Sequence, residues 1–152
     1  MRSRLWGERG FGLTELLIVF GLIAVMGILA VPNLLRYWQT STLGAAADEF
    51  AGVLSRARAL AVTQNTTVCA QVTGTNVRLL TGGCGGTVWA GTGTDAAGVI
   101  ALSNSMQLSG SPTVVFTGTG GATALANFTV TNPTNGNTRG VAVATTGRVT
   151  IQ

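Results

Sequence analysis

The sequence predicts an α+β protein in which a long N-terminal helix, membrane-spanning in its first half, packs on a C-terminal antiparallel β-sheet or small β-sandwich. Three observations indicate this fold: an apolar run over residues 11–31, helically spaced apolar residues over 32–66, and Thr- and Gly-rich strand patterns over 67–152. Residues 1–10 form a separate short basic segment. With 152 residues, the chain has room for one compact head and no second enzyme-sized domain.

The apolar run FGLTELLIVFGLIAVMGILAV contains one charged residue, Glu15. As a helix it would be about 30 Å long, enough to cross the hydrocarbon core of a bilayer. Basic residues precede the run and do not return until Arg36, so the positive-inside rule places Met1 in the cytoplasm and the head outside it. Because a carboxylate in a membrane span costs about 2.5 kcal/mol or more, we expect Glu15 to have a partner.

The helical pattern continues beyond Pro32 but becomes one-sided, which predicts an amphipathic helix with one face to bury. Its apolar face consists of Leu43, Ala46, Ala47, Phe50, Val53, Leu54, Ala57, Leu60 and Ala61. We expect Pro32 to bend or loosen the helix, because proline removes a backbone hydrogen bond. We expect Arg56 and Arg58, on the other face, to be solvated or paired with another chain.

The remaining sequence alternates short β-prone runs with turn clusters such as GGCGG, SGSP and NPTNGN. These runs predict strands over residues 67–72, 77–81, 99–102, 113–117, 128–131, 140–144 and 148–151. Their apolar faces are thin. We therefore expect the amphipathic helix to lie across the sheet and complete the core.

The composition restricts the chemistry that is available to the chain. There is no histidine, and Asp95 is the only acid after residue 67, so no catalytic, metal or cofactor site is expected. The only cysteines are Cys69 and Cys84, fifteen positions apart. In an exported domain this pair predicts one disulfide, and two free buried thiols are the alternative.

The junction RGFGLTELLIVFGLIAVMGILAVP resembles the class III signal of the type IV pilin and pseudopilin superfamily. The resemblance implies that prepilin peptidase cuts after Gly10 and that Phe11 becomes the N-methylated first residue. It also implies that Glu15 pairs with the Phe11 amine of a neighbouring subunit and that Pro32 is the helix proline of the family. The alternatives are an ordinary signal anchor and a secretory signal cleaved after the run, although the run exceeds the ~7–15 residues of such a signal.

Two further segments resemble one branch of this superfamily, the GspH/FimT group. Residues 46–68, AADEFAGVLSRARALAVTQNTTV, are similar to its helix, and ATTGRVTIQ is similar to its final strand. The resemblance implies a pilin-like fold and a non-enzymatic minor pilin or pseudopilin of a type IV pilus or type II secretion system. Such a subunit is held in the bacterial inner membrane before it joins other subunits; a major pilin is the alternative.

The FimT branch offers a second function, DNA binding during natural transformation, attributed to a C-terminal Gly-Arg-x-Arg motif. This chain has Gly147 and Arg148 but Thr150 in place of the second arginine. The resemblance therefore implies DNA as an alternative partner of Arg148, with Arg139 and Arg78 as further phosphate contacts. The contrasting interpretation is that Arg148 is a solvated strand residue.

Overall fold

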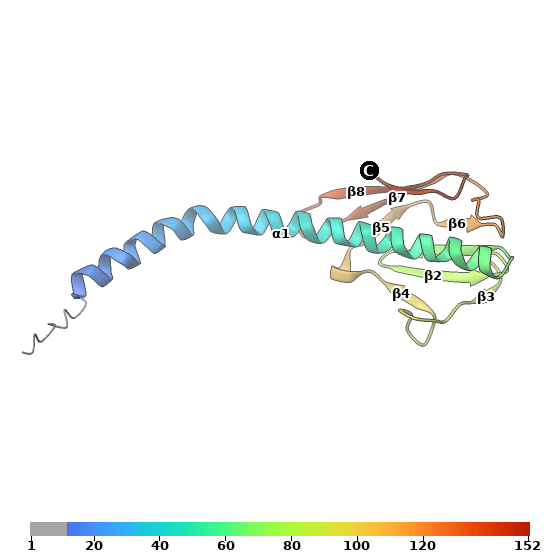
Figure 1. Ribbon diagram of the computed structural model, residues 1–152, viewed down its shortest axis with the longest axis horizontal. Coiled ribbons are helices and arrows are strands. Elements are labelled where there is room, and N and C mark those ends of the chain that lie inside the picture. Colours follow the sequence, from blue (N-terminus) through green and yellow to red (C-terminus); the bar gives the residue numbers. More distant parts are fainter. Residues whose placement is uncertain (1–11) are drawn as a thin grey trace, which may run out of the picture. The chain divides into compact units, whose positions relative to one another are not determined.

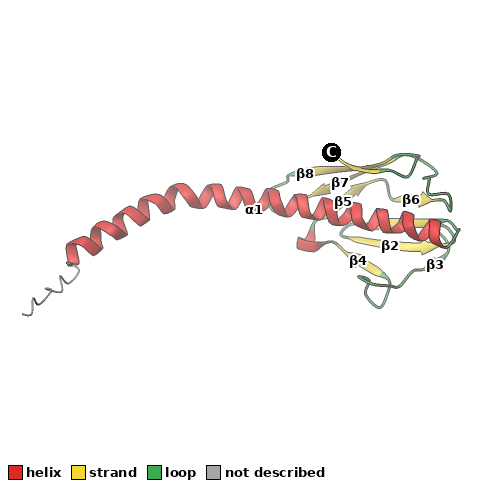
Figure 2. Ribbon diagram, viewed as in Figure 1, coloured by secondary structure: helices red, strands yellow, loops and turns green. Residues whose placement is uncertain are grey.

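A computed structural model of the chain describes residues 12–152, so the predicted cleavage and methylation positions, Gly10 and Phe11, lie outside the described residues. The chain divides into two units, one ending at Trp38 and one formed by Gln39–Gln152. The helix α1 (Leu13–Thr63) contributes to both units, and all the strands of the described chain follow it (Figure 1, Figure 2).

In the first unit, α1 carries apolar side chains that no other described part of the chain covers. Phe20 is 60% exposed and Trp38 is 61% exposed. The most apolar window of the helix has a mean hydropathy of 2.5 and is not buried at all, so by length and composition α1 could cross a membrane. Pro32 lies inside the helix without ending it.

The second unit contains two antiparallel sheets. The first sheet has the order β3-β2-β1-β6, with β4 also paired to β2, and the second has the order β5-β7-β8-β9. The strands of the first sheet are β1 (Val68–Thr73), β2 (Asn76–Thr81), β3 (Thr87–Val88), β4 (Val99–Ala101) and β6 (Thr113–Phe116). Those of the second are β5 (Gln107–Gly110), β7 (Ala126–Thr131), β8 (Thr138–Val143) and β9 (Val149–Ile151).

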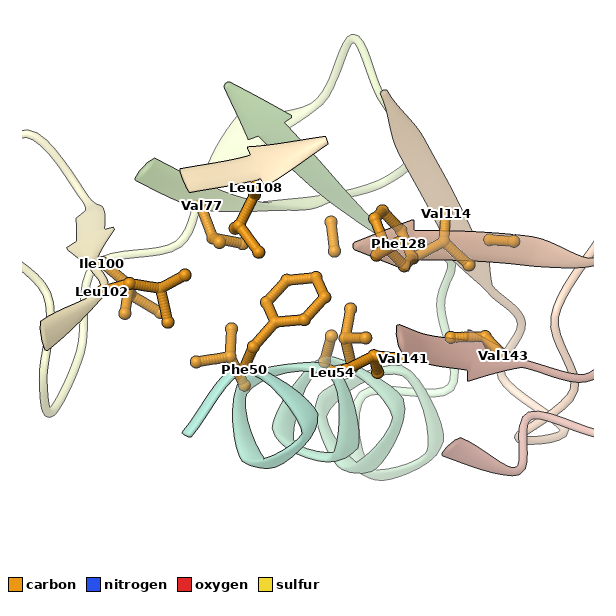
Figure 3. Packing of buried hydrophobic residues seen from close by; sticks show 14 of the residues in the cluster. Phe50, Leu54, Val77, Ile100, Leu102, Leu108, Val114, Phe128, Val141 and Val143 are labelled. Atoms are coloured by element: carbon orange, nitrogen blue, oxygen red, sulfur yellow. The ribbon is translucent and has the colours of Figure 1, made fainter. Parts of the chain in front are cut away.

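A single hydrophobic core joins the two sheets to residues 43–61 of α1. The ring of Phe50 points from the helix between the sheets and meets Phe128 of β7 edge-on, with 5.1 Å between the ring centroids (Figure 3). The predicted apolar face of the helix is buried as expected, except that Leu60 is only partly buried. The prediction that the amphipathic helix completes the core is therefore confirmed.

All the predicted strands are present, with ends displaced by at most two residues, and two further strands, β3 and β5, were not predicted. Strand β3 has two residues, too few to show an alternating pattern. In β5 only Leu108 is buried, and the strand ends in Ser109 and Gly110, which are weak strand formers. Its place in the sheet depends on pairing with β7, which local sequence does not reveal.

Cys69 and Cys84 form a disulfide. Cys69 lies in β1 and is fully buried, whereas Cys84 lies in the exposed connection between β2 and β3. Cys69 faces away from α1, because its strand neighbours Val68 and Ala70 are the residues that join the core. The disulfide therefore ties the glycine-rich connection to the outer face of the first sheet.

Replacing Phe50 with alanine should destabilise the second unit by about 3–5 kcal/mol, because the substitution leaves a cavity in the core that joins helix and sheets. The free energy of unfolding of the full chain in non-ionic micelles, followed by near-ultraviolet circular dichroism, tests this. Ser55→Ala on the exposed face of the same helix is the control and should change stability by less than about 0.5 kcal/mol. Equal effects of the two substitutions would contradict the assignment of the core.

Candidate functional site

Arg58 holds two loops of the head against α1. Its Nε donates a hydrogen bond of 2.7 Å to the carbonyl oxygen of Gly120, and an Nη donates one of 3.4 Å to the carbonyl oxygen of Thr146. Gly120 lies in the connection from β6 to β7, and Thr146 lies in the turn from β8 to β9. One guanidinium therefore links the helix to loops that arise from both sheets.

Gly147 allows these loops to meet. Its φ of 76° lies in the left-handed region, and Gly120 has a φ of 84°. A Cβ on Gly147 would overlap the carbonyl oxygen of Gly120 and would lie 2.9 Å from Nε of Arg58. The helix segment and the final-strand segment that resemble one protein group thus meet at Arg58 and Gly147.

Other polar side chains of α1 also bind the head loops. Arg56 donates to the carbonyl oxygen of Thr92 at 2.5 Å, and the Glu49 carboxylate accepts the backbone N–H of Ser103 at 3.2 Å. The expectation for Arg56 and Arg58 was therefore wrong in one respect. Both are exposed, but their guanidinium groups are hydrogen-bonded to carbonyl oxygens of the same chain, because the loops close over the edges of the helix.

Arg148, Arg139 and Arg78 lie in three separate hollows of the head. Arg148 borders a groove of about 690 Å³ together with Arg58, whereas Arg139 borders another hollow beside Leu43. Arg78 borders a smaller one of about 230 Å³ on the first sheet, between Gln71 and Val99. Since its strand neighbours Val77 and Leu79 are in the core, Arg78 faces away from α1.

The distances along α1 confirm that Arg139 and Arg148 do not form one patch. A Cβ on Gly44 would lie 3.5 Å from Nη1 of Arg139, so Arg139 reaches the helix near Gly44. Arg148 shares its groove with Arg58, about 21 Å further along the helix. The structure thus brings no two of the three predicted DNA-binding arginines together. The arginine beside Arg148 is instead Arg58, which was not among the three predicted DNA-binding residues.

Glu15 lies in the first turn of α1, where its side chain is exposed and its backbone N–H donates to the carbonyl oxygen of Gly12 at 3.0 Å. A carboxylate in a first turn interacts favourably with the positive end of the helix dipole. Within residues 12–152, no group of three potential metal ligands occurs. Within the described residues, the candidate functional features are thus the exposed apolar surface of α1 and the hollows on the head.

Comparisons with known proteins agree with this architecture. The model of the family "Type II transport protein GspH" matches residues 46–147. No curated relative matches the chain. The chain is similar to the type IV minor pilin FimU of Pseudomonas aeruginosa, with 18% identity, a TM-score of 0.56, and coverage of 76% of this chain and 92% of the FimU chain.

A second similar structure is the minor pseudopilin EpsH from the type 2 secretion system of Vibrio cholerae. Its identity is 10% and its TM-score 0.56, and the match covers 72% of this chain and 95% of EpsH. At such identities the two structures show a shared fold alone. The predicted pilin-like fold, a long N-terminal helix packed on antiparallel sheets, is confirmed.

Gly147→Ala should lower the free energy of unfolding of the head by about 2–4 kcal/mol, because it adds an overlap with Gly120 to the strain of a left-handed residue. Gly136→Ala is a matched control: its φ is 71°, and a Cβ there would meet nothing within 4 Å. This control should lose only about 1 kcal/mol. Denaturant unfolding of the full chain in micelles measures both, and losses of equal size would show that the approach to Gly120 is unimportant.

Proposed function

Because the chain belongs to the family of type II transport protein GspH, we propose that it is a minor pilin or pseudopilin subunit whose assembly is driven by α1. In this proposal, prepilin peptidase cleaves the chain after Gly10. Before assembly, the subunit is anchored in the bacterial inner membrane with its head outside the cytoplasm. It then joins other subunits in a type IV pilus or a type II secretion pseudopilus.

The observation that carries the proposal is a difference between the two parts of α1. The first part has an uncovered apolar surface, and the second part has an apolar face that is buried in the head. Large side chains such as Leu17, Ile23 and Ile28 are 61%, 57% and 74% exposed, whereas Phe50 and Leu54 are fully buried. A continuous apolar surface of this kind is unfavourable in water and requires lipid or protein to cover it. Lipid before assembly and neighbouring helices afterwards would provide that cover with no change in the fold of the head.

Glu15 would direct this assembly. In lipid the carboxylate has an energetic cost, and the free amine that cleavage creates at Phe11 of a neighbouring subunit would be a partner of opposite charge. Such pairing would favour one axial register between helices whose other side chains are apolar and offer little specificity. Methylation of the amine leaves its positive charge in place, so it is compatible with the pairing.

The head would provide specificity for neighbouring subunits. The hydrogen bonds from Arg56 and Arg58 fix loop segments beside the helix, so that the surface around α1 has a defined form. No observation on the head favours the DNA-binding alternative over this structural role, since Arg78, Arg139 and Arg148 lie in separate hollows.

Glu15→Gln should leave cleavage of the leader intact and reduce recovery of the subunit in purified filaments by about tenfold or more, because the neutral side chain cannot pair with an amine. Asp48→Asn is the matched control, an exposed acid on the same helix within the head, and it should assemble normally. Intact mass of the membrane-bound chain reports cleavage, and immunoblotting of sheared filaments reports assembly.

The variant Gly10→Val tests the proposed cleavage by prepilin peptidase in the same experiment, because it removes the glycine after which the chain would be cut. The variant should retain residues 1–10 and should not enter filaments. Cleavage of the wild-type chain elsewhere than after Gly10, or normal assembly of Glu15→Gln, would contradict the proposed function.

A further inference from the structure

The groove beside the last turns of α1 combines an apolar wall with two positive charges. We call it the α1–β9 groove; it is bordered by Arg58, Ala59 and Val62 of the helix, by Gly120, and by Arg148 and Val149. Its volume is about 690 Å³, within the range of sites that hold a small ligand or a few side chains. Val62 is 48% exposed, an apolar surface that the head leaves open to water.

The two arginines differ in how they are held. Arg58 is anchored by its hydrogen bonds to Gly120 and Thr146, so its charge stays at the edge of the groove. Among residues 12–152, the guanidinium of Arg148 has no hydrogen-bond or ion-pair partner, and no acid borders the groove. The groove therefore carries two uncompensated positive charges, one fixed and one able to adjust to a ligand.

The geometry points to the α1–β9 groove as a docking site for a neighbouring pilin-type subunit, through a segment that carries a carboxylate beside an aliphatic side chain. The carboxylate would meet the guanidinium of Arg148, a geometry that favours paired hydrogen bonds. The aliphatic side chain would cover Val62 and Val149. This inference rests on the proposed function, because it assumes that other subunits lie beside the head.

A peptide segment fits the groove better than a nucleic acid does. The walls include exposed aliphatic groups and no aromatic ring on which a base could stack. Arg58 uses two of its donors on carbonyl oxygens of the chain, which leaves Arg148 as the main phosphate contact. Binding to a nucleic acid relies on several such contacts. Arg139 could not add one in this groove, because it reaches α1 near Gly44, about 21 Å along the helix from Arg58.

The test follows the arginine Nε–H resonances of the full ¹⁵N-labelled chain in non-ionic micelles during titration with acetyl-Leu-Glu-Leu-amide. The signals of Arg58 and Arg148 should shift and saturate, whereas that of Arg139 should not move. The isosteric peptide acetyl-Leu-Gln-Leu-amide should bind about tenfold more weakly, because it lacks the charge. Arg148→Ala should weaken binding of the Glu peptide about tenfold, read at Arg58, and Arg139→Ala should leave it unchanged.

Several results would overturn the inference. These are the absence of a saturable shift, equal binding of the Glu and Gln peptides, or equal loss in the Arg148 and Arg139 variants. Shifts produced by a short DNA duplex and not by the Glu peptide would assign the groove to a nucleic acid. Shifts that grow with protein concentration in the absence of peptide would assign it to a second copy of this chain. Processing and assembly are measured separately with Glu15→Gln, so either hypothesis can fail without the other.

Discussion

Burial of one face of α1 is the interaction on which the head depends. Both sheets share one core with the helix, and the largest buried side chain on the helix, Phe50, lies between them against Phe128. Each sheet therefore contributes one wall of a core whose third wall is the helix. Small residues on that helix face, such as Ala46, Ala47 and Ala57, are also buried and belong to the same core.

The loops are held by polar contacts to the edges of the same helix. Arg58 bonds connections that arise from both sheets, Arg56 bonds the connection from β3 to β4 of the first sheet, and Glu49 bonds the connection from β4 to β5, which leads from the first sheet to the second. Gly147 is needed for packing, since its missing side chain makes space for Gly120 and Arg58. Arg148, the next residue, is exposed and takes no part in that packing. The two adjacent residues thus differ in the structure: the glycine permits the packing of the loops, whereas the arginine is left at the surface, where we propose that it docks a neighbouring subunit.

The two units of the chain differ in how their apolar side chains are covered. In the second unit the apolar face of α1 is covered by strands, so its burial stabilises the folded head. In the first unit the apolar side chains surround the helix, and they are exposed in the part of the chain that the structure describes. A helix that is apolar on all sides must be covered by lipid or by other protein chains. This requirement connects the fold to the proposed function in assembly.

Local sequence was sufficient to predict the class of fold, the helix face from Leu43 to Ala61 and the strands with clear alternation, because these features repeat with the period of the backbone. It failed for β5, whose strand state depends on pairing with β7, and for Arg58, whose partners are 62 and 88 residues away. The separation of Arg78, Arg139 and Arg148 also depended on sheet order and on strand faces. The sequence by itself thus determined the long helix, its apolar span and the strands with a clear alternating pattern, whereas only the tertiary structure decided the strands β3 and β5 and which side chains meet, because those contacts join segments that are distant along the chain.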